Sequence, residues 1–216
     1  MFITFEGIEG SGKSTVMEML AQHLENKGFE VCRTREPGAT RLGRALRSIL
    51  LDARTEHLAD RAELFLFLAD RAQHVAEIIL PAIEEEQIVL CDRYMDSTLV
   101  YQGAGRGMDP DRMRSLNDMA VCGMLPDLTL LFDLSVETGL SRAGARNCEN
   151  GTVISEGRFE AESMAFHSRV RSAYLELAAE EPDRISIIDA EQAPDDVLLQ
   201  CISAVERKLQ EYGRLS

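Results

Sequence analysis

The start of the chain carries the pattern that most constrains its fold. Residues 7–14 read GIEGSGKS and satisfy GxxxxGKS, between a short apolar run at 2–5 and a segment with apolar residues at helical spacing. In this pattern backbone N–H groups and a helix N-terminus bind phosphates, the lysine reaches the β- and γ-phosphates, and the serine hydroxyl binds Mg²⁺. The sequence therefore predicts a nucleoside triphosphate site formed by Gly7, Ile8, Glu9, Gly10, Ser11, Gly12, Lys13, Ser14 and Thr15.

The rest of the chain alternates strand and helix patterns. Strands are predicted at 2–5, 30–34, 88–91, 128–133 and 184–188. Helices are predicted at 41–51, at 58–86 with a break near Pro81, from Asp96, from Pro110, at 136–142 and at 194–212. This alternation predicts an α/β fold, a parallel sheet of about five strands with helices on both faces, in a single domain 1–216. Residues 144–157 lack periodicity and are predicted to form a mobile loop or lid, within about 143–160.

The overall charge excludes some functions. With 23 Lys and Arg against 37 Asp and Glu, the net charge is −14, which argues against binding nucleic acid or anionic lipid surfaces. The apolar runs 64–69 and 78–83 are far shorter than the ~20 residues of a membrane span, and no signal-peptide pattern opens the chain. We therefore expect a cytoplasmic protein whose five scattered cysteines are reduced and mostly buried: Cys32, Cys91, Cys122, Cys148 and Cys201.

Two groups of residues predict a second anionic ligand. Five arginines within residues 33–47 (Arg33, Arg35, Arg41, Arg44 and Arg47) accompany one acid, Glu36. This pattern suits a phosphate or carboxylate ligand, although a solvated helix face has the same composition.

Asp92 and Arg93 follow the strand at 88–91, where parallel sheets place ligand groups. Asp92 can hold Mg²⁺ through water and Arg93 can bridge two phosphates, the alternative being a surface ion pair.

The motifs together resemble one enzyme family. The sequence lacks the NKxD motif of switch GTPases. The runs TFEGIEGSGKS, TREPG, LRSILLD, FLADRAQH, CDRYMDSTLVYQGAGRG, PDLTLLFDL and FHSRVRSAYLELA occur in the order seen in bacterial thymidylate kinases. The resemblance covers about the whole chain, and TREPG, ADRAQH and DRYxxST…YQG are its most specific elements. It implies the P-loop nucleoside monophosphate kinase fold and the conversion of dTMP to dTDP with Mg-ATP, a step of dTTP biosynthesis.

The resemblance also implies roles for individual residues. Phe67 would stack on thymine, although its helical spacing also fits a core position, and Arg71 would bond the base edge. Arg47 and Arg93 would clamp the acceptor phosphate, and Glu9 would lie near the sugar hydroxyl or a metal-bound water. Tyr101 would crowd the 2′ position of a ribose. The other implied substrate contacts are Glu36, Pro37, Ser97, Thr98 and Gln102. A homodimer is implied, with an apolar helix face such as that of residues 61–79 as its interface.

The catalytic arginine is predicted in the lid. The variable P-loop positions hold no arginine, so the lid must supply one. Arg146 aligns best with the catalytic arginine of the family; Arg142 and Arg158 are second candidates and are also predicted to bind the donor nucleotide. Gly144, Asn147, Gly157 and an apparent insertion at 150–154 depart from the family pattern. Lys13, Arg93, Arg146, Glu9 and Asp92 form the predicted catalytic set. The alternatives are a P-loop kinase for another acceptor, such as dUMP, CMP or a carboxylate metabolite, and a nucleotide-binding regulatory or assembly protein.

Overall fold

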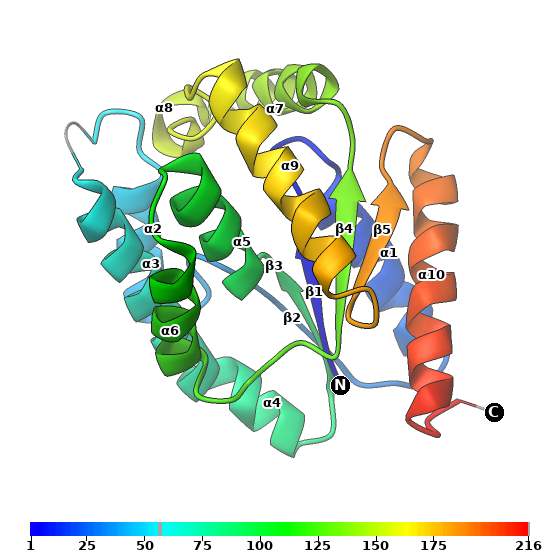
Figure 1. Cartoon of the computed structure of the whole chain (residues 1–216). Helices are drawn as coiled ribbons and strands as arrows, with labels where there is room; N and C mark the ends of the chain where they lie inside the picture. The colour runs from blue at the N-terminus through cyan, green and yellow to red at the C-terminus, as the bar shows by residue number, and fades with distance from the viewer. Residues whose placement is uncertain (56–57, 216) are drawn as a thin grey trace.

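The computed structural model describes residues 1–55 and 58–215 and contains the predicted parallel sheet. Its five strands lie in the order β2-β3-β1-β4-β5, and each pairs in parallel with its neighbours (Figure 1). The strands are β1 (Phe2–Glu6), β2 (Val31–Arg35), β3 (Ile88–Asp92), β4 (Leu128–Asp133) and β5 (Ile185–Asp189). Because Phe5 of β1 pairs with both Asp92 and Leu130, the carboxyl ends of the three central strands meet at one edge.

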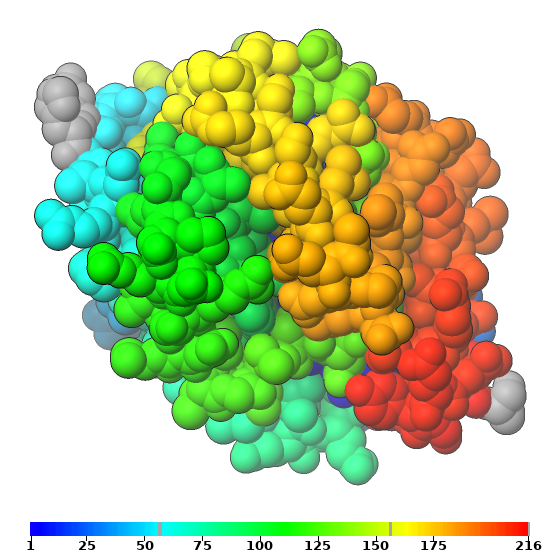
Figure 2. Space-filling view, viewed as in Figure 1, coloured from blue at the N-terminus to red at the C-terminus, as the bar shows by residue number. Residues whose placement is uncertain are grey.

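Helices cover both faces of the sheet. Helix α9 crosses the front of the sheet in Figure 1 and α1 lies behind it, with α10 packed against α1. Figure 2 shows the side chains of α9 (yellow to orange) beside those of α6 (green) and α10 (red), closing over this face. The helices are α1 (Lys13–Asn26), α2 (Arg41–Leu50), α3 (Asp60–His74), α4 (Leu80–Glu84), α5 (Met95–Thr98), α6 (Pro110–Val121), α7 (Val136–Asn150), α8 (Val153–Glu156), α9 (Met164–Glu180) and α10 (Pro194–Glu211), with π-helical segments η1 (Val75–Ile79) and η2 (Leu99–Gly105).

The fully buried centre of the sheet gives the loop between β1 and α1 a rigid support. Ile3 and Phe5 of β1 have no exposed surface, and α1 packs Leu20 and Leu24 into the same core, as its spacing predicts. Burial of such apolar side chains stabilises the fold by about 1.5–3 kcal/mol each. The loop between β1 and α1 is therefore attached to rigid elements at both ends.

The predicted break near Pro81 takes the form of a π-helical segment. Residues 75–79, immediately before Leu80 and Pro81, form η1 between α3 and α4. Proline lacks an N–H and its ring collides with the carbonyl four residues earlier, so the preceding turn widens. Residues 103–105, predicted as loop, likewise belong to the π-helical segment η2.

The prediction of a loop from residue 144 was wrong. Helix α7 continues to Asn150 and ends at Gly151, which adopts φ 67°, and α8 follows. The inward face of this last part of α7 is polar: Asn147 is buried, and its amide donates to Glu160 Oε1 at 3.2 Å. Hydrophobic periodicity cannot detect a helix whose buried face is an amide, which is why the sequence pattern failed here.

Two expectations about apolar residues are only partly met. Cys91 and Cys201 are buried, but Cys122 and Cys148 are exposed, and all five cysteines are free thiols. In the predicted interface at 61–79, Leu64, Leu68, Val75 and Ile79 face the interior of the chain, whereas Phe65 is exposed. Most of that apolar face is therefore core. Within residues 1–55 and 58–215, no helix is long and apolar enough to cross a membrane.

Candidate active site

The loop between β1 and α1 has the backbone that its glycines predict. Gly7, Gly10 and Gly12 all adopt positive φ, and α1 begins at Lys13. A side chain at Gly10 would lie 2.0 Å from the carbonyl oxygen of Gly139, so only glycine fits this close approach to α7. The resulting turn directs its N–H groups and the start of α1 toward one space, which is the geometry of a phosphate site.

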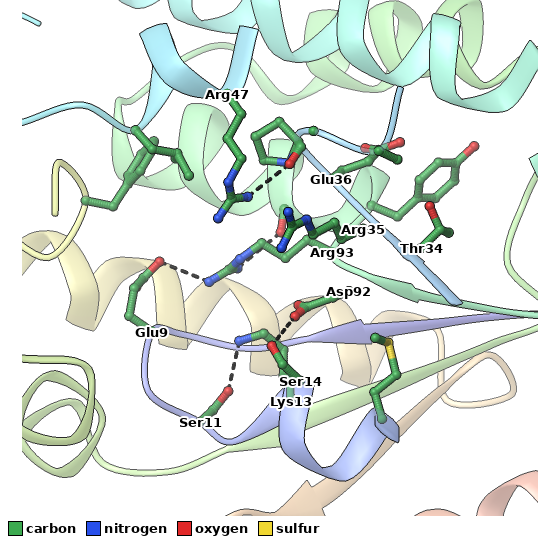
Figure 3. A pocket seen from close by; sticks show the side chains of 18 of the residues that line it. Glu9, Ser11, Lys13, Ser14, Thr34, Arg35, Glu36, Arg47, Asp92 and Arg93 are labelled. Atoms are coloured by element: carbon green, nitrogen blue, oxygen red, sulfur yellow. Dashed lines mark hydrogen bonds and ion pairs between the residues drawn. The ribbon is translucent and has the colours of Figure 1, made fainter. Parts of the chain in front are cut away.

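Lys13 lies folded over this loop. Its ammonium donates to the carbonyl oxygens of Gly7 at 3.1 Å and Ile8 at 2.9 Å, and to Ser11 Oγ at 2.9 Å (Figure 3). Burial, followed by repulsion from Arg93, lowers the pKa of Lys13 to about 8, while Asp92 and Glu9 oppose the shift. A phosphate here would replace the carbonyl contacts with charge-assisted ones and raise the pKa of Lys13 again, because a nearby anion favours the ammonium form.

Two oxygen groups suited to a divalent metal lie at the end of β3. Ser14 Oγ donates to Asp92 Oδ2 at 2.5 Å, which joins the first turn of α1 to the neighbouring strand. A hydroxyl and a carboxylate are ligands that Mg²⁺ accepts, with phosphate and water oxygens completing its octahedron. No cluster of three or more His, Cys, Asp or Glu side chains suited to a metal occurs in the described part of the chain. The pair therefore fits a metal held mainly by a bound nucleotide.

Arg93 lies at the centre of the pocket. Its Nη2 donates to Glu9 Oε1 at 3.0 Å, and its guanidinium lies 5.0 Å from the centre of the Tyr101 ring. Tyr101 Oη donates to the same Glu9 oxygen at 2.6 Å. Although burial opposes it, the Arg93 charge lowers the pKa of Glu9 to about 2, so Glu9 is a carboxylate at neutral pH. Figure 3 shows Arg93 between Glu9 and Arg35, with Arg47 approaching from α2.

A second group of residues lies beyond Arg93. Glu36, which precedes the cis peptide bond to Pro37, accepts from Arg71 Nε at 2.9 Å and lies 2.8 Å from His74 Nδ1. Arg71 also donates to Thr98 Oγ1, Asn117 Oδ1 and the carbonyl of Tyr94. Arg47 Nη1 donates to the carbonyl of Pro37 at 2.9 Å. These hydrogen bonds join the TREPG turn to the ADRAQH part of α3, and together the two segments form one wall of the pocket.

Aromatic rings close this end of the pocket. Phe67 is half-buried, and its ring centre lies 6.1 Å from that of Phe159, which in turn packs edge-on against Tyr101 at 5.5 Å. Phe67 therefore lines the cavity while also packing on the core, so its core interpretation is confirmed in part and its stacking on a base stays a prediction. Phe159 was missed from the sequence, because it lies at the end of the lid, 58 residues from Tyr101 along the chain.

The polar residues of α5 and η2 are already hydrogen-bonded. Ser97 Oγ donates to Glu6 Oε2 at 2.7 Å, and Gln102 Nε2 donates to Glu63 Oε1 at 2.8 Å. Both residues and Thr98 line the pocket, as predicted. The carboxylates that orient them, Glu6 and Glu63, were not identified from the sequence.

The three candidate lid arginines occupy different places. Arg142 and Arg146 line the pocket: Arg142 donates to the carbonyl of Ala190, and Arg146, with half of its side chain exposed, contacts Asn147 and Glu160. Arg158 instead forms an ion pair with buried Glu63 and donates to the carbonyl of Leu50. The geometry thus favours Arg146 or Arg142 over Arg158 as a group that reaches a nucleotide.

Most of these groups line one cavity of about 990 Å³, whereas Glu6, Glu63, His74 and Asn117 bond to lining residues without lining it themselves. Nine cationic side chains line it against five carboxylates, although the chain as a whole is acidic. The cations are Lys13, Arg33, Arg35, Arg44, Arg47, Arg71, Arg93, Arg142 and Arg146. Four of the five arginines at 33–47 are among them, which favours the anion-binding interpretation over a solvated helix face. Of the predicted residues, Gly7, Ile8 and Arg158 do not form part of this lining.

Known proteins match the chain over its length. Residues 5–200 match the family described as thymidylate kinase. A thymidylate kinase of Desulfovibrio desulfuricans is 61% identical over 99% of both chains, and one of Nitratidesulfovibrio vulgaris is 58% identical over 99% of this chain and 100% of its own. The crystal structure of thymidylate kinase from Ehrlichia chaffeensis superposes with a TM-score of 0.75, at 33% identity over 95% of this chain and 97% of that one. The chain therefore belongs to the thymidylate kinase family.

Proposed function

We propose that this cavity transfers the γ-phosphoryl group of ATP to the phosphate of dTMP, giving ADP and dTDP. The observation that carries the proposal is a single cavity in which a phosphate-binding loop faces an arginine-lined wall, with Arg93 between them. The acceptor phosphate is already an anion and needs no general base. The chain's task is therefore to align two anions and neutralise the charge that develops between them.

At the donor end, the loop 7–15 would hold the triphosphate. Lys13 would leave its carbonyl partners for the β- and γ-phosphates. Ser14 and Asp92 would hold Mg²⁺, directly or through water; bound there, Mg²⁺ would neutralise phosphate charge. Glu9 would fix the angle of Arg93 through their ion pair and lie near the sugar or a metal-bound water.

At the acceptor end, Arg93 and Arg47 would hold the phosphate of dTMP. Phe67 would stack on thymine, and Arg71, which uses one of the two N–H groups of Nη2 on Tyr94, would offer the other to the base edge. Tyr101 would exclude a 2′-hydroxyl, since its own hydroxyl and ring are held by Glu9 and Phe159. The remaining substrate contacts would come from Glu36, Pro37, Ser97, Thr98 and Gln102.

The lid would supply the last positive charge. Arg146 would swing from Asn147 and Glu160 onto the transferring phosphoryl group, with Arg142 on the donor nucleotide. Closure of 143–160 over the cavity would exclude water and so prevent hydrolysis of ATP. Arg158 would hold the end of the lid against α3 through Glu63.

A panel of monophosphates in a coupled ADP assay tests the proposal. Purified protein with Mg-ATP should form ADP rapidly with dTMP and much more slowly with dUMP or CMP. Turnover of another monophosphate in preference to dTMP would overturn the assignment of the acceptor. No ADP with any acceptor would favour a nucleotide-binding regulatory role.

The protein is further proposed to act as a homodimer in the cytoplasm. Exposed Leu42 and Ile49 of α2, Phe65 of α3 and Met119 of α6 place large apolar side chains on helices that contact one another. Light scattering after size exclusion should give twice the mass of 24.1 kDa, and the Phe65→Glu variant should give the single mass. The free thiols suit a reducing compartment.

A further inference from the structure

Glu6 is a fully buried carboxylate that phosphoryl transfer does not itself require. It ends β1, directly before the phosphate-binding loop, and none of its surface is exposed. Its Oε1 accepts from the backbone N–H of Tyr94 at 2.7 Å and of Ser97 at 3.3 Å. Its Oε2 accepts from Ser97 Oγ at 2.7 Å and from Tyr174 Oη at 2.6 Å. Every one of these donors lies next to Arg93 in sequence or in space.

The first link between Glu6 and Arg93 runs through the backbone. Arg93 adopts φ 67°, a left-handed conformation that is unfavourable for a residue with a side chain. Its own N–H donates to the carbonyl of Phe5 at 3.0 Å, and the next N–H, of Tyr94, donates to Glu6. Two consecutive residues of β1 therefore hold the two N–H groups on either side of this strained position.

The second link runs through hydroxyl groups. An ionised carboxylate only accepts hydrogen bonds, so Ser97 and Tyr174 must both direct their single hydroxyl proton at Glu6. Their oxygen lone pairs then face Arg93, whose Nη1 lies 3.3 Å from Ser97 Oγ and 3.4 Å from Tyr174 Oη. Glu6 thus orients the two hydroxyl groups so that their oxygen atoms, and not their protons, face the guanidinium of Arg93.

The charges around Glu6 agree with such a partnership. Burial and the nearby Asp96 raise the pKa of Glu6, whereas Arg93 and the hydrogen bonds of Ser97 and Tyr174 oppose that rise. Asp96 is itself paired with Arg184 at 2.7 Å. Arg93 is therefore a cation that favours the carboxylate form of Glu6, while Glu6 orders the groups that hold Arg93.

We propose that Glu6 is a positioning residue for Arg93: through Tyr94, Ser97 and Tyr174 it holds that guanidinium where the donor and acceptor phosphates meet. The proposal rests on the proposed function, because it assumes that Arg93 acts on those phosphates. Glu6 itself touches no substrate. Its role differs from that of Glu9, which contacts Arg93 directly at the opposite nitrogen.

A double-mutant cycle tests this role. In Glu6→Gln, a side chain of the same shape, the amide nitrogen donates to the hydroxyls and turns their protons toward Arg93. We expect kcat with dTMP to fall at least tenfold, while the KM for ATP stays within twofold, since the loop 7–15 is unchanged. In an Arg93→Met background, where the guanidinium is absent, the same Glu6→Gln change should alter the single-turnover rate less than twofold.

A merely structural role would give a different pattern. Glu6→Gln would then lower the rate by the same factor in both backgrounds, and that result would overturn the proposal. If Glu6→Gln does not fold, as judged by circular dichroism, Tyr174→Phe replaces it in the same double-mutant cycle. We then expect Tyr174→Phe to lower kcat three- to tenfold in the unaltered protein and to have no effect on the single-turnover rate in the Arg93→Met background. Tyr212→Phe is the matched control: it also removes a hydroxyl from a carboxylate, Asp127 at 2.7 Å, but far from the cavity, and should leave kcat unchanged.

The same measurements separate this proposal from the function on which it rests. If the unaltered protein does not phosphorylate dTMP, the proposed function fails. If it does so and the two Glu6→Gln factors are equal, only the role of Glu6 fails.

Discussion

Replacing the lid arginines one at a time should separate catalysis from stability. Among the described residues, the polar contacts of Arg146 are the lid side chains of Asn147 and Glu160, and half of Arg146 is exposed, whereas Arg158 pairs with Glu63, whose side chain is completely buried. Arg146→Ala should therefore lower kcat about 10³-fold, equivalent to about 4 kcal/mol of transition-state stabilisation. Its free energy of unfolding should change by less than about 0.5 kcal/mol, as for an exposed ion pair.

Arg158→Ala should show the opposite pattern. Glu63 would keep Gln102 and Arg106 as partners but lose one of two cations, and the carbonyl of Leu50 would lose its donor. Breaking a buried pair costs about 3–5 kcal/mol, and the remaining partners reduce this to about 2 kcal/mol. For a chain of this size the Tm should fall by about 4–8 °C. At 25 °C kcat should stay within about threefold of the unaltered value.

Two measurements on the same samples decide between these patterns. Differential scanning calorimetry gives the Tm, and the coupled ADP assay at saturating dTMP and ATP gives kcat. Arg142→Ala completes the series: because Arg142 is held by the carbonyl of Ala190, we expect a raised KM for ATP with a smaller effect on kcat. A full loss of turnover in Arg158→Ala, with Arg146→Ala active, would refute the assignment.

Further predictions concern single side chains. Lys13→Ala should remove turnover with an unchanged circular dichroism spectrum, and unchanged turnover would exclude its phosphate role. Tyr101→Gly should raise the ribonucleotide-to-dTMP ratio of kcat/KM at least tenfold, and a constant ratio would contradict the crowding of the 2′ position. Burial and the nearby Glu36 raise the pKa of Asp70 to about 6, above its ordinary value of about 4, so its contribution to stability is present at pH 4 and lost as pH rises through 6. The gain in the free energy of unfolding from Asp70→Asn should therefore grow by about 2–3 kcal/mol between pH 4 and pH 7, and urea titrations showing no growth would refute this.

The sequence predicted the elements whose information is local. The loop 7–14 needs only its glycines, Lys13 and the flanking strand and helix, all contiguous in the chain. The five strands and most of the helices along the chain followed from periodicity in the same way, but the 17-residue helix α9 (Met164–Glu180) and the spatial order of the strands were not predicted. Residue roles such as those of Arg71 and Phe67 came from resemblance to a family, not from local pattern.

The supporting carboxylates could not be predicted, because their partners are distant in sequence. Glu6 and Tyr174 are 168 residues apart, and Glu63 and Arg158 are 95 apart. Nothing in either neighbourhood distinguishes a buried, paired carboxylate from a solvated one, since Glu6 is a single acid at the end of an apolar strand and Glu63 is one of two acids in the first turn of a helix. The helical part of the lid was missed for a related reason: Asn147 is a polar residue on a buried face, stabilised by Glu160 from the other side of the lid.

The arrangement of charge explains how so acidic a chain can act on two anions. Ionic screening limits the reach of exposed carboxylates to about 8 Å in physiological salt, so the net charge of −14 acts mainly on the outer surface. Inside the cavity, four of the five acids are paired with arginines: Glu18 with Arg33 and Glu160 with Arg146, where one partner is exposed, and Glu36 with Arg71 and Glu9 with Arg93, where both side chains are largely buried. An ion pair with a carboxylate fixes the position of a guanidinium but reduces the positive potential that it produces. This arrangement suits the proposed positions that must hydrogen-bond a base or bridge two phosphates. The attraction for the nucleotides then depends on the cations of the loop 7–15, α2 and the lid. Because electrostatic attraction acts over several ångströms, these cations need not be placed as exactly as those that form hydrogen bonds to the substrate. Position and charge are thus supplied by different arginines of the same cavity.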